Sequence, residues 1–136
     1  MTLDVDLVRR TVAGPAIPYG PEAVCVNLGR RYRFQPGWAR LVRPVRLLRD
    51  HDEAQRLGEL LTLAETPDAM HVLARVRRGR AGDRALALAG EGRLWFSAGV
   101  ELTATVPDPL NQGVRLVLGG DLVEITLTDR PAFDWR

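Results

Sequence analysis

Alternation of apolar and polar residues with a period of two recurs along most of this chain, and it constrains the fold more than any other feature. The even-numbered residues of Met70–Val76, for example, are all apolar and share one face, which is the pattern of a half-buried strand. Turn-forming tripeptides such as Gln35-Pro36-Gly37 and Thr66-Pro67-Asp68 separate the short apolar runs. The sequence therefore predicts a mainly β fold of the α+β class. We expect a closed or barrel-like antiparallel sheet of about seven strands, flanked by one or two helices.

The expected strands follow from this periodicity and from the turn residues between them. They cover Arg10–Tyr19, Glu22–Leu28, Arg31–Phe34, Leu41–Leu48, Arg56–Ala64, Met70–Val76, Leu94–Val106, Val114–Leu118 and Leu122–Thr128. Gly119-Gly120-Asp121 is expected to be the turn between the last two strands.

One segment, Ala81–Glu91, has the composition of a helix. Gly82 or Asp83 can cap its start, and Gly90 or Gly92 can end it. Its alanines and leucines fill more than one stripe of the helix, which suggests a second contact surface and hence a two-fold homodimer. The alternative is that alanine simply favours helix on an exposed face.

Length and composition indicate a single soluble domain over residues 1–136, with 46% hydrophobic and 26% charged residues. No apolar run approaches the roughly 20 residues that span a bilayer, so we expect no membrane segment. The acidic start Met1–Asp6 is not that of a signal peptide. Cys25 is the only cysteine, which excludes an internal disulfide and a cysteine-based zinc site. We therefore expect an intracellular protein with no metal and no cofactor.

Every basic side chain is an arginine, and the net charge is only +2. Arginine is well suited to phosphate recognition, so nucleic-acid binding has to be considered. The arginines are mostly scattered among acidic residues, however, with short clusters only at 30–33 and 75–80. This distribution argues against a nucleic-acid partner.

Ser97 is the only serine in the chain and lies in an aromatic and glycine-containing strand segment. Serine is normally among the commonest residues, so a single retained one is a candidate nucleophile. The alternative, which Ser97 taken alone favours, is compositional drift in a chain rich in arginine, alanine, leucine and glycine. Alternation places Ser97 away from the apolar face of its strand, and Glu124 away from the apolar face of the last strand. If these strands are neighbours, both side chains contribute to one site. The alternative for Glu124 is a solvated strand carboxylate.

His51 follows an apolar strand and lies between Asp50 and Asp52. Histidine is the usual general base near neutral pH, and neighbouring carboxylates favour its imidazolium form. The alternative is a histidine in a polar turn. His71 is the rival base, but alternation places it on the sheet surface. If His51 activates Ser97, we expect their side chains to approach to about 2.6–3.2 Å, or somewhat further in a resting structure.

Three blocks in order resemble the prohead (capsid-maturation) proteases of tailed phages, relatives of the herpesvirus assemblin fold. They are residues 10–20 with 31–37, Val45–Asp52 with Arg56-Leu57-Gly58, and the expected helix and Gly92 with Phe96–Val100 and Leu122–Phe133. The resemblance covers about residues 9 to 133. One departure is Leu94-Trp95-Phe96 before the serine, where the family has a small residue and leucine.

The resemblance implies an assemblin-like fold with Ser97 as nucleophile, His51 as general base and Glu124 as the residue that orients the histidine. It implies a serine endopeptidase that cleaves the scaffolding segment of the major capsid protein, and itself, in the bacterial cytoplasm inside the assembling prohead. It also implies a homodimer paired through helices. The alternative from another class is a catalytically inactive β-barrel assembly or scaffold protein that binds capsid subunits.

Overall fold

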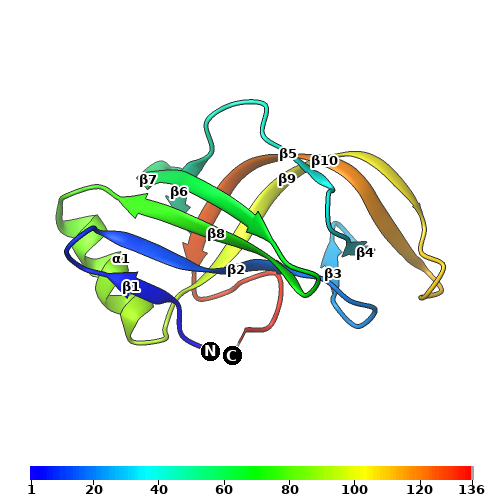
Figure 1. Cartoon of the computed structure of the whole chain (residues 1–136), viewed down its shortest axis with the longest axis horizontal. Helices are drawn as coiled ribbons and strands as arrows, with labels where there is room; N and C mark the ends of the chain where they lie inside the picture. The colour runs from blue at the N-terminus through cyan, green and yellow to red at the C-terminus, as the bar shows by residue number, and fades with distance from the viewer. Residues whose placement is uncertain (136) are drawn as a thin grey trace.

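A large, bent β-sheet carries most of the chain in the computed structural model, which describes residues 1–135 (Figure 1). The elements, in chain order, are β1 (Asp4–Asp6), β2 (Thr11–Pro18), β3 (Val24–Asn27), β4 (Arg30–Phe34), β5 (Ala39–Arg40), β6 (Arg46–Arg49), β7 (Asp52–Glu65), β8 (Ala69–Val76), α1 (Arg80–Gly90), β9 (Trp95–Pro107) and β10 (Val114–Thr128). The mainly β, α+β prediction is confirmed.

The sheet is mixed and open, so the prediction of a closed antiparallel barrel of about seven strands is wrong. Ten strands join in the order β1-β2-β8-β7-β6-β10-β4-β3, and β5 and β9 also pair with β10. The strand β10 runs parallel to β4, β5 and β6 in succession along one edge, and antiparallel to β9 along the other. The long β9–β10 hairpin sweeps across the molecule behind β7 and β8 (Figure 1). Among the described residues, β9 forms a ladder with β10 alone, which leaves the sheet unclosed.

The predicted turn at Gly119-Gly120-Asp121 is also wrong, because these residues continue a single strand, β10. The ladder with β9 shifts register on both sides of Gly119, which indicates a β-bulge. A Cβ atom on Gly120 would lie 3.1 Å from the carbonyl oxygen of Glu101 and 3.3 Å from the Trp38 ring. The two glycines therefore bend the strand and allow close approach, instead of reversing the chain.

The predicted strand Leu41–Leu48 is only partly present, since its first residues form a loop between β5 and β6. Pro44 lies in this loop and has no backbone N–H to donate to a ladder. The short β1 was not predicted, because three residues carry too little periodicity to identify.

The helix is confirmed to within one residue, but its expected N-cap is wrong. Gly79, at φ 133°, precedes the first turn, and Gly82 is instead buried in the helix against the Arg77 carbonyl oxygen. Gly92 ends the helix at φ 73°, and its N–H donates to the Ala89 carbonyl oxygen. Residues 82, 85, 86 and 89 form its one buried stripe. No described helix is both long and apolar enough to cross a membrane.

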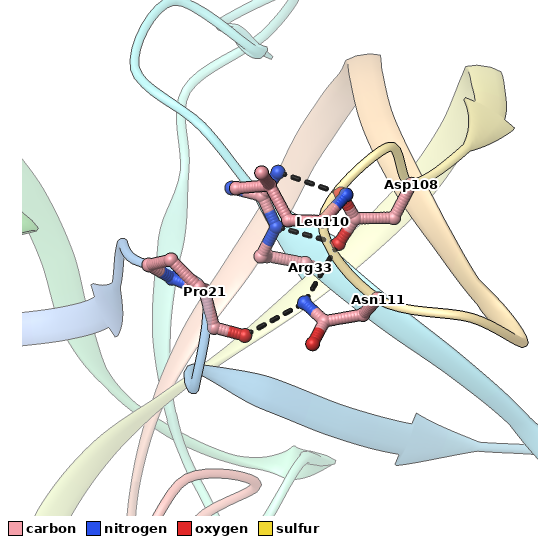
Figure 2. Close-up of polar contacts among 5 residues, drawn as sticks. All are labelled: Pro21, Arg33, Asp108, Leu110 and Asn111. Atoms are coloured by element: carbon pink, nitrogen blue, oxygen red, sulfur yellow. Dashed lines mark hydrogen bonds and ion pairs between the residues drawn. The ribbon is translucent and has the colours of Figure 1, made fainter.

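A buried ion pair fastens the β3–β4 hairpin to the loop that follows β9 (Figure 2). Arg33 donates from Nε and Nη2 to the two carboxylate oxygens of Asp108, at 2.7 and 2.8 Å. Asp108 also accepts hydrogen bonds from the Leu110 N–H and the Asn111 amide, and that amide donates to the Pro21 carbonyl oxygen. The hydrogen bonds from Arg33 hold the pKa of Asp108 well below its usual range.

Candidate functional site

The tight turn between β6 and β7 carries His51 in an unusual backbone conformation. Asp50 and His51 have φ values of 53° and 56°, and Arg49 pairs with Asp52 across the turn. Positive φ at both central residues is typical of a type I′ hairpin, which favours glycine at the second position. The β3–β4 turn follows that preference, with Leu28 and Gly29 at φ 51° and 79°. In the β6–β7 turn a histidine stands where glycine is favoured.

Two backbone hydrogen bonds fix this turn to β10. The N–H of His51 donates to the Thr126 hydroxyl at 2.8 Å, and the N–H of Asp50 donates to the Leu127 carbonyl oxygen at 3.2 Å. Thr126 is fully buried. The parallel pairing of β6 with β10, which sets Thr126 beside Leu48, brings the end of β6 to this point. The position of the His51 backbone is therefore set by β10.

Glu124, also on β10, pairs with the His51 ring. Its Oε1 atom lies 2.5 Å from His51 Nδ1, and the glutamate is 7% exposed. This hydrogen bond, with the carboxylate's charge, raises the pKa of His51 above its ordinary value despite the opposing effect of burial. A carboxylate accepts hydrogen bonds only, so Nδ1 carries a proton and Nε2 is the nitrogen left free.

Gly99 on β9 makes room for this contact. It is the cross-strand partner of Glu124, and a Cβ atom added there would lie 2.4 Å from Glu124 Oε1 and 2.8 Å from its carboxyl carbon. No ordinary Cβ contact is that short, so any other residue would displace the carboxylate. Gly99, two positions after Ser97, thus leaves the space in which the Glu124 carboxylate contacts His51.

Ser97 lies directly opposite Thr126 in the β9–β10 ladder. It is 3% exposed, and its Oγ accepts a hydrogen bond from the Ala132 N–H at 3.3 Å. Ser97 and His51 line the same cavity of about 330 Å³, but among the described residues no hydrogen bond joins their side chains. The expected direct hydrogen bond between Ser97 and His51 is therefore not formed in this structure, although both side chains line the same cavity.

The structure brings Ser97, His51 and Glu124 together from three separate parts of the chain, and it leaves His71 elsewhere. His71 lines another hollow, beside Asp4 and Thr62, which is formed by β1, β2, β7 and β8. Sequence reasoning did not identify the Ala132 N–H, because a backbone donor leaves no trace in a residue pattern.

The same cavity contains the lone cysteine, Cys25. Burial raises the pKa of its thiol, so the thiol stays protonated and is a poor nucleophile. Within residues 1–135, no three histidine, cysteine or acidic side chains gather as a metal-binding group.

A scan against protein-family models and searches of curated proteins and of solved structures found no match to this chain.

Proposed function

We propose that the protein is a serine endopeptidase with Ser97 as nucleophile, His51 as general base and Glu124 as the residue that orients the histidine. The observation that carries the proposal is the His51–Glu124 hydrogen bond, which occupies Nδ1 and leaves Nε2 free on a histidine that lines the same cavity as Ser97. A base held by a carboxylate through Nδ1 and acting through Nε2 is the arrangement that activates a serine hydroxyl.

The proposed reaction begins as His51 Nε2 takes the Ser97 hydroxyl proton while Oγ bonds to the scissile carbonyl carbon. Glu124 stabilises the imidazolium that forms. The imidazolium then gives its proton to the leaving amine as the carbon–nitrogen bond breaks. Water, deprotonated by the same nitrogen, releases the new carboxyl group from Oγ, and the proton returns to Ser97. The step requires that the histidine or serine side chain rotate to bring Nε2 and Oγ within hydrogen-bond reach.

Ala132 offers a backbone donor for the charge that develops on the carbonyl oxygen. Its N–H already points at Ser97 Oγ, so it lies next to the reacting carbon. One such donor contributes about 3 kcal/mol to stabilisation of the transition state.

The substrate proposed from the sequence resemblance is the scaffolding segment of the phage major capsid protein, together with the chain itself. The place of action is then the assembling prohead in the bacterial cytoplasm.

We also retain the homodimer as a proposal. The large exposed apolar residues lie in loops and strands, not on α1, so the dimer surface need not be the helix.

A second function, a non-catalytic assembly protein, is favoured by one observation. The Ser97 hydroxyl is bonded to Ala132 and not to His51. In that case the protein would be a protease that has lost its catalytic activity and keeps only a role in particle assembly.

Cleavage of a peptide library made from a digested bacterial proteome separates these two functions. The endopeptidase predicts new termini that are absent with Ser97→Ala and with His51→Ala, but present with His71→Ala, the matched histidine control. An unchanged library with the wild-type protein, or equal cleavage by Ser97→Ala, contradicts the assignment.

A further inference from the structure

A second hollow adjoins the Ser97 cavity and differs from it in chemistry. It has a volume of about 180 Å³, and its polar lining comes from Arg30, Thr103, Thr105 and Arg115. Tyr32 and Leu102 line both hollows. We call the second one the arginine hollow. The two hollows thus lie next to each other along β9, the first lined by Ser97 and the second by Thr103 and Thr105.

Strand pairing places the two arginines in this hollow. Arg115 is the parallel partner of Tyr32, and Arg30 lies two residues before Tyr32 on the same face of β4. Arg115 is anchored to β9, because its Nε donates to the Thr105 hydroxyl at 3.2 Å and its Nη2 to the Thr105 carbonyl oxygen at 3.0 Å. Arg30, at the start of the strand, is exposed.

Neither arginine has an acidic partner. No ion pair involves Arg30 or Arg115 among residues 1–135, and no carboxylate lines the arginine hollow. By contrast, Arg33, the neighbour that faces away from Tyr32, is fully paired with Asp108 (Figure 2). Guanidinium groups bind carboxylates through paired, charge-assisted hydrogen bonds, so two unpaired ones in a hollow are complementary to an acidic group.

The Ser97 cavity, in contrast, is complementary to an uncharged side chain. Most of its lining is apolar, and its ionisable side chains are those of His51, Tyr32 and Cys25, whose thiol stays protonated. The apolar residues that line it are Ile17, Val26, Phe34, Ala98, Val100, Leu102, Ala132 and Phe133. A buried charge without a partner is costly, so such a cavity rejects charged residues.

We propose that the two hollows form one substrate groove. A polypeptide would place an apolar side chain in the Ser97 cavity beside the scissile bond, and an aspartate or glutamate farther along would pair with Arg30 and Arg115. Ser97 and Thr103 are six residues apart on β9, so the acidic residue lies about 20 Å from the scissile bond, or roughly six residues of extended chain. This inference rests on the proposed endopeptidase function.

The test uses the same proteome-derived peptide library and compares the residues around each cleaved bond. The wild type is expected to cut beside apolar residues, with aspartate and glutamate enriched about six positions away. In the double variant Arg30→Glu/Arg115→Glu this enrichment is expected to disappear or to change to lysine and arginine. On a single acidic peptide taken from the library, kcat/KM should fall at least tenfold.

Arg31→Glu is the matched control, because it makes the same charge change on the opposite face of β4 and should leave the enrichment unaltered. The single variant Arg30→Glu is a second test in case the double variant misfolds, because Arg30 is exposed at the β3–β4 turn and its replacement should not disturb the fold. Fluorophosphonate labelling of Ser97 should be unchanged in all three variants. Cleavage and labelling with no acidic preference, or with a preference that survives in the double variant, overturn the groove alone. Absence of both cleavage and labelling in the wild type overturns the endopeptidase as well.

Discussion

At the scale of single residues, His51 is held in a conformation that the backbone disfavours. A non-glycine residue in the left-handed region costs of order 1 kcal/mol or more, and the chain uses glycine at the equivalent position of its other tight hairpin, Gly29. Arg10, Leu28 and Asp50 also have positive φ values, so the conformation alone assigns no role, and the Glu124 contact is what distinguishes His51.

Replacing His51 by glycine should therefore stabilise the turn in a protein that already lacks the His51–Glu124 ion pair. In a Glu124→Gln background, His51→Gly is expected to raise the free energy of unfolding by about 1 kcal/mol, as measured by urea denaturation. Cleavage should be lost in the same protein. A fall in stability in this background would show that the His51 conformation is not strained.

Activity should depend on pH through the His51–Glu124 pair. The base must be neutral to accept the Ser97 proton, and Glu124 raises the pKa of His51 above 6.5. We expect kcat/KM to rise with pH along a limb whose midpoint lies above 6.5. Glu124→Gln should lower both that midpoint and the plateau, whereas His71→Ala should change neither. A midpoint that stays in place in Glu124→Gln would contradict the pairing.

At the scale of elements, β10 is the part of the fold that assembles the site. It supplies Glu124, and it supplies Thr126, which lies directly opposite Ser97 and holds the His51 turn by accepting the His51 N–H. Alternation predicted that Ser97 and Glu124 both avoid the apolar faces of their strands, and so share a surface if the strands are neighbours, and β9 and β10 do pair. It could not predict that Gly119 and Gly120 continue a strand, since a bulge and a turn use the same residues. Nor could it show that the parallel pairing of β6 brings His51 there, because sequence periodicity carries no information on strand order.

Thr126 is expected to act as a positioning residue. Thr126→Val keeps the shape but removes the acceptor for the His51 N–H, so kcat should fall about tenfold while KM changes little. Thr126→Ser retains the hydroxyl and should recover most of the rate. A valine variant as active as the wild type, assayed by peptide cleavage, would show that the turn needs no such anchor.

At the scale of the whole molecule, the Arg33–Asp108 pair joins the β3–β4 hairpin to the far end of the β9–β10 hairpin. Removing one partner of a buried ion pair leaves an uncompensated charge, so Asp108→Ala is expected to cost roughly 3 kcal/mol of unfolding free energy. Arg40→Ala breaks the more exposed pair with Asp121 and should cost under about 1 kcal/mol. Equal losses in denaturant titrations would mean that burial does not distinguish the two pairs.

Because the pKa of Asp108 is depressed, the contribution of the Arg33–Asp108 ion pair to the free energy of unfolding depends on pH. The carboxylate pairs with Arg33 only when ionised, so its stabilisation is present above the ordinary carboxyl pKa and is lost as acid lowers the pH through the depressed value. In Asp108→Asn this part of the acid sensitivity should be absent.

Mass spectrometry of a fluorophosphonate adduct is the most direct test of whether Ser97 is a nucleophile activated by His51. We expect one covalent adduct, on Ser97, that is absent in His51→Ala and retained in His71→Ala. No adduct on the folded wild-type protein across the pH range, or an adduct on Ser97 that persists in His51→Ala, would contradict it.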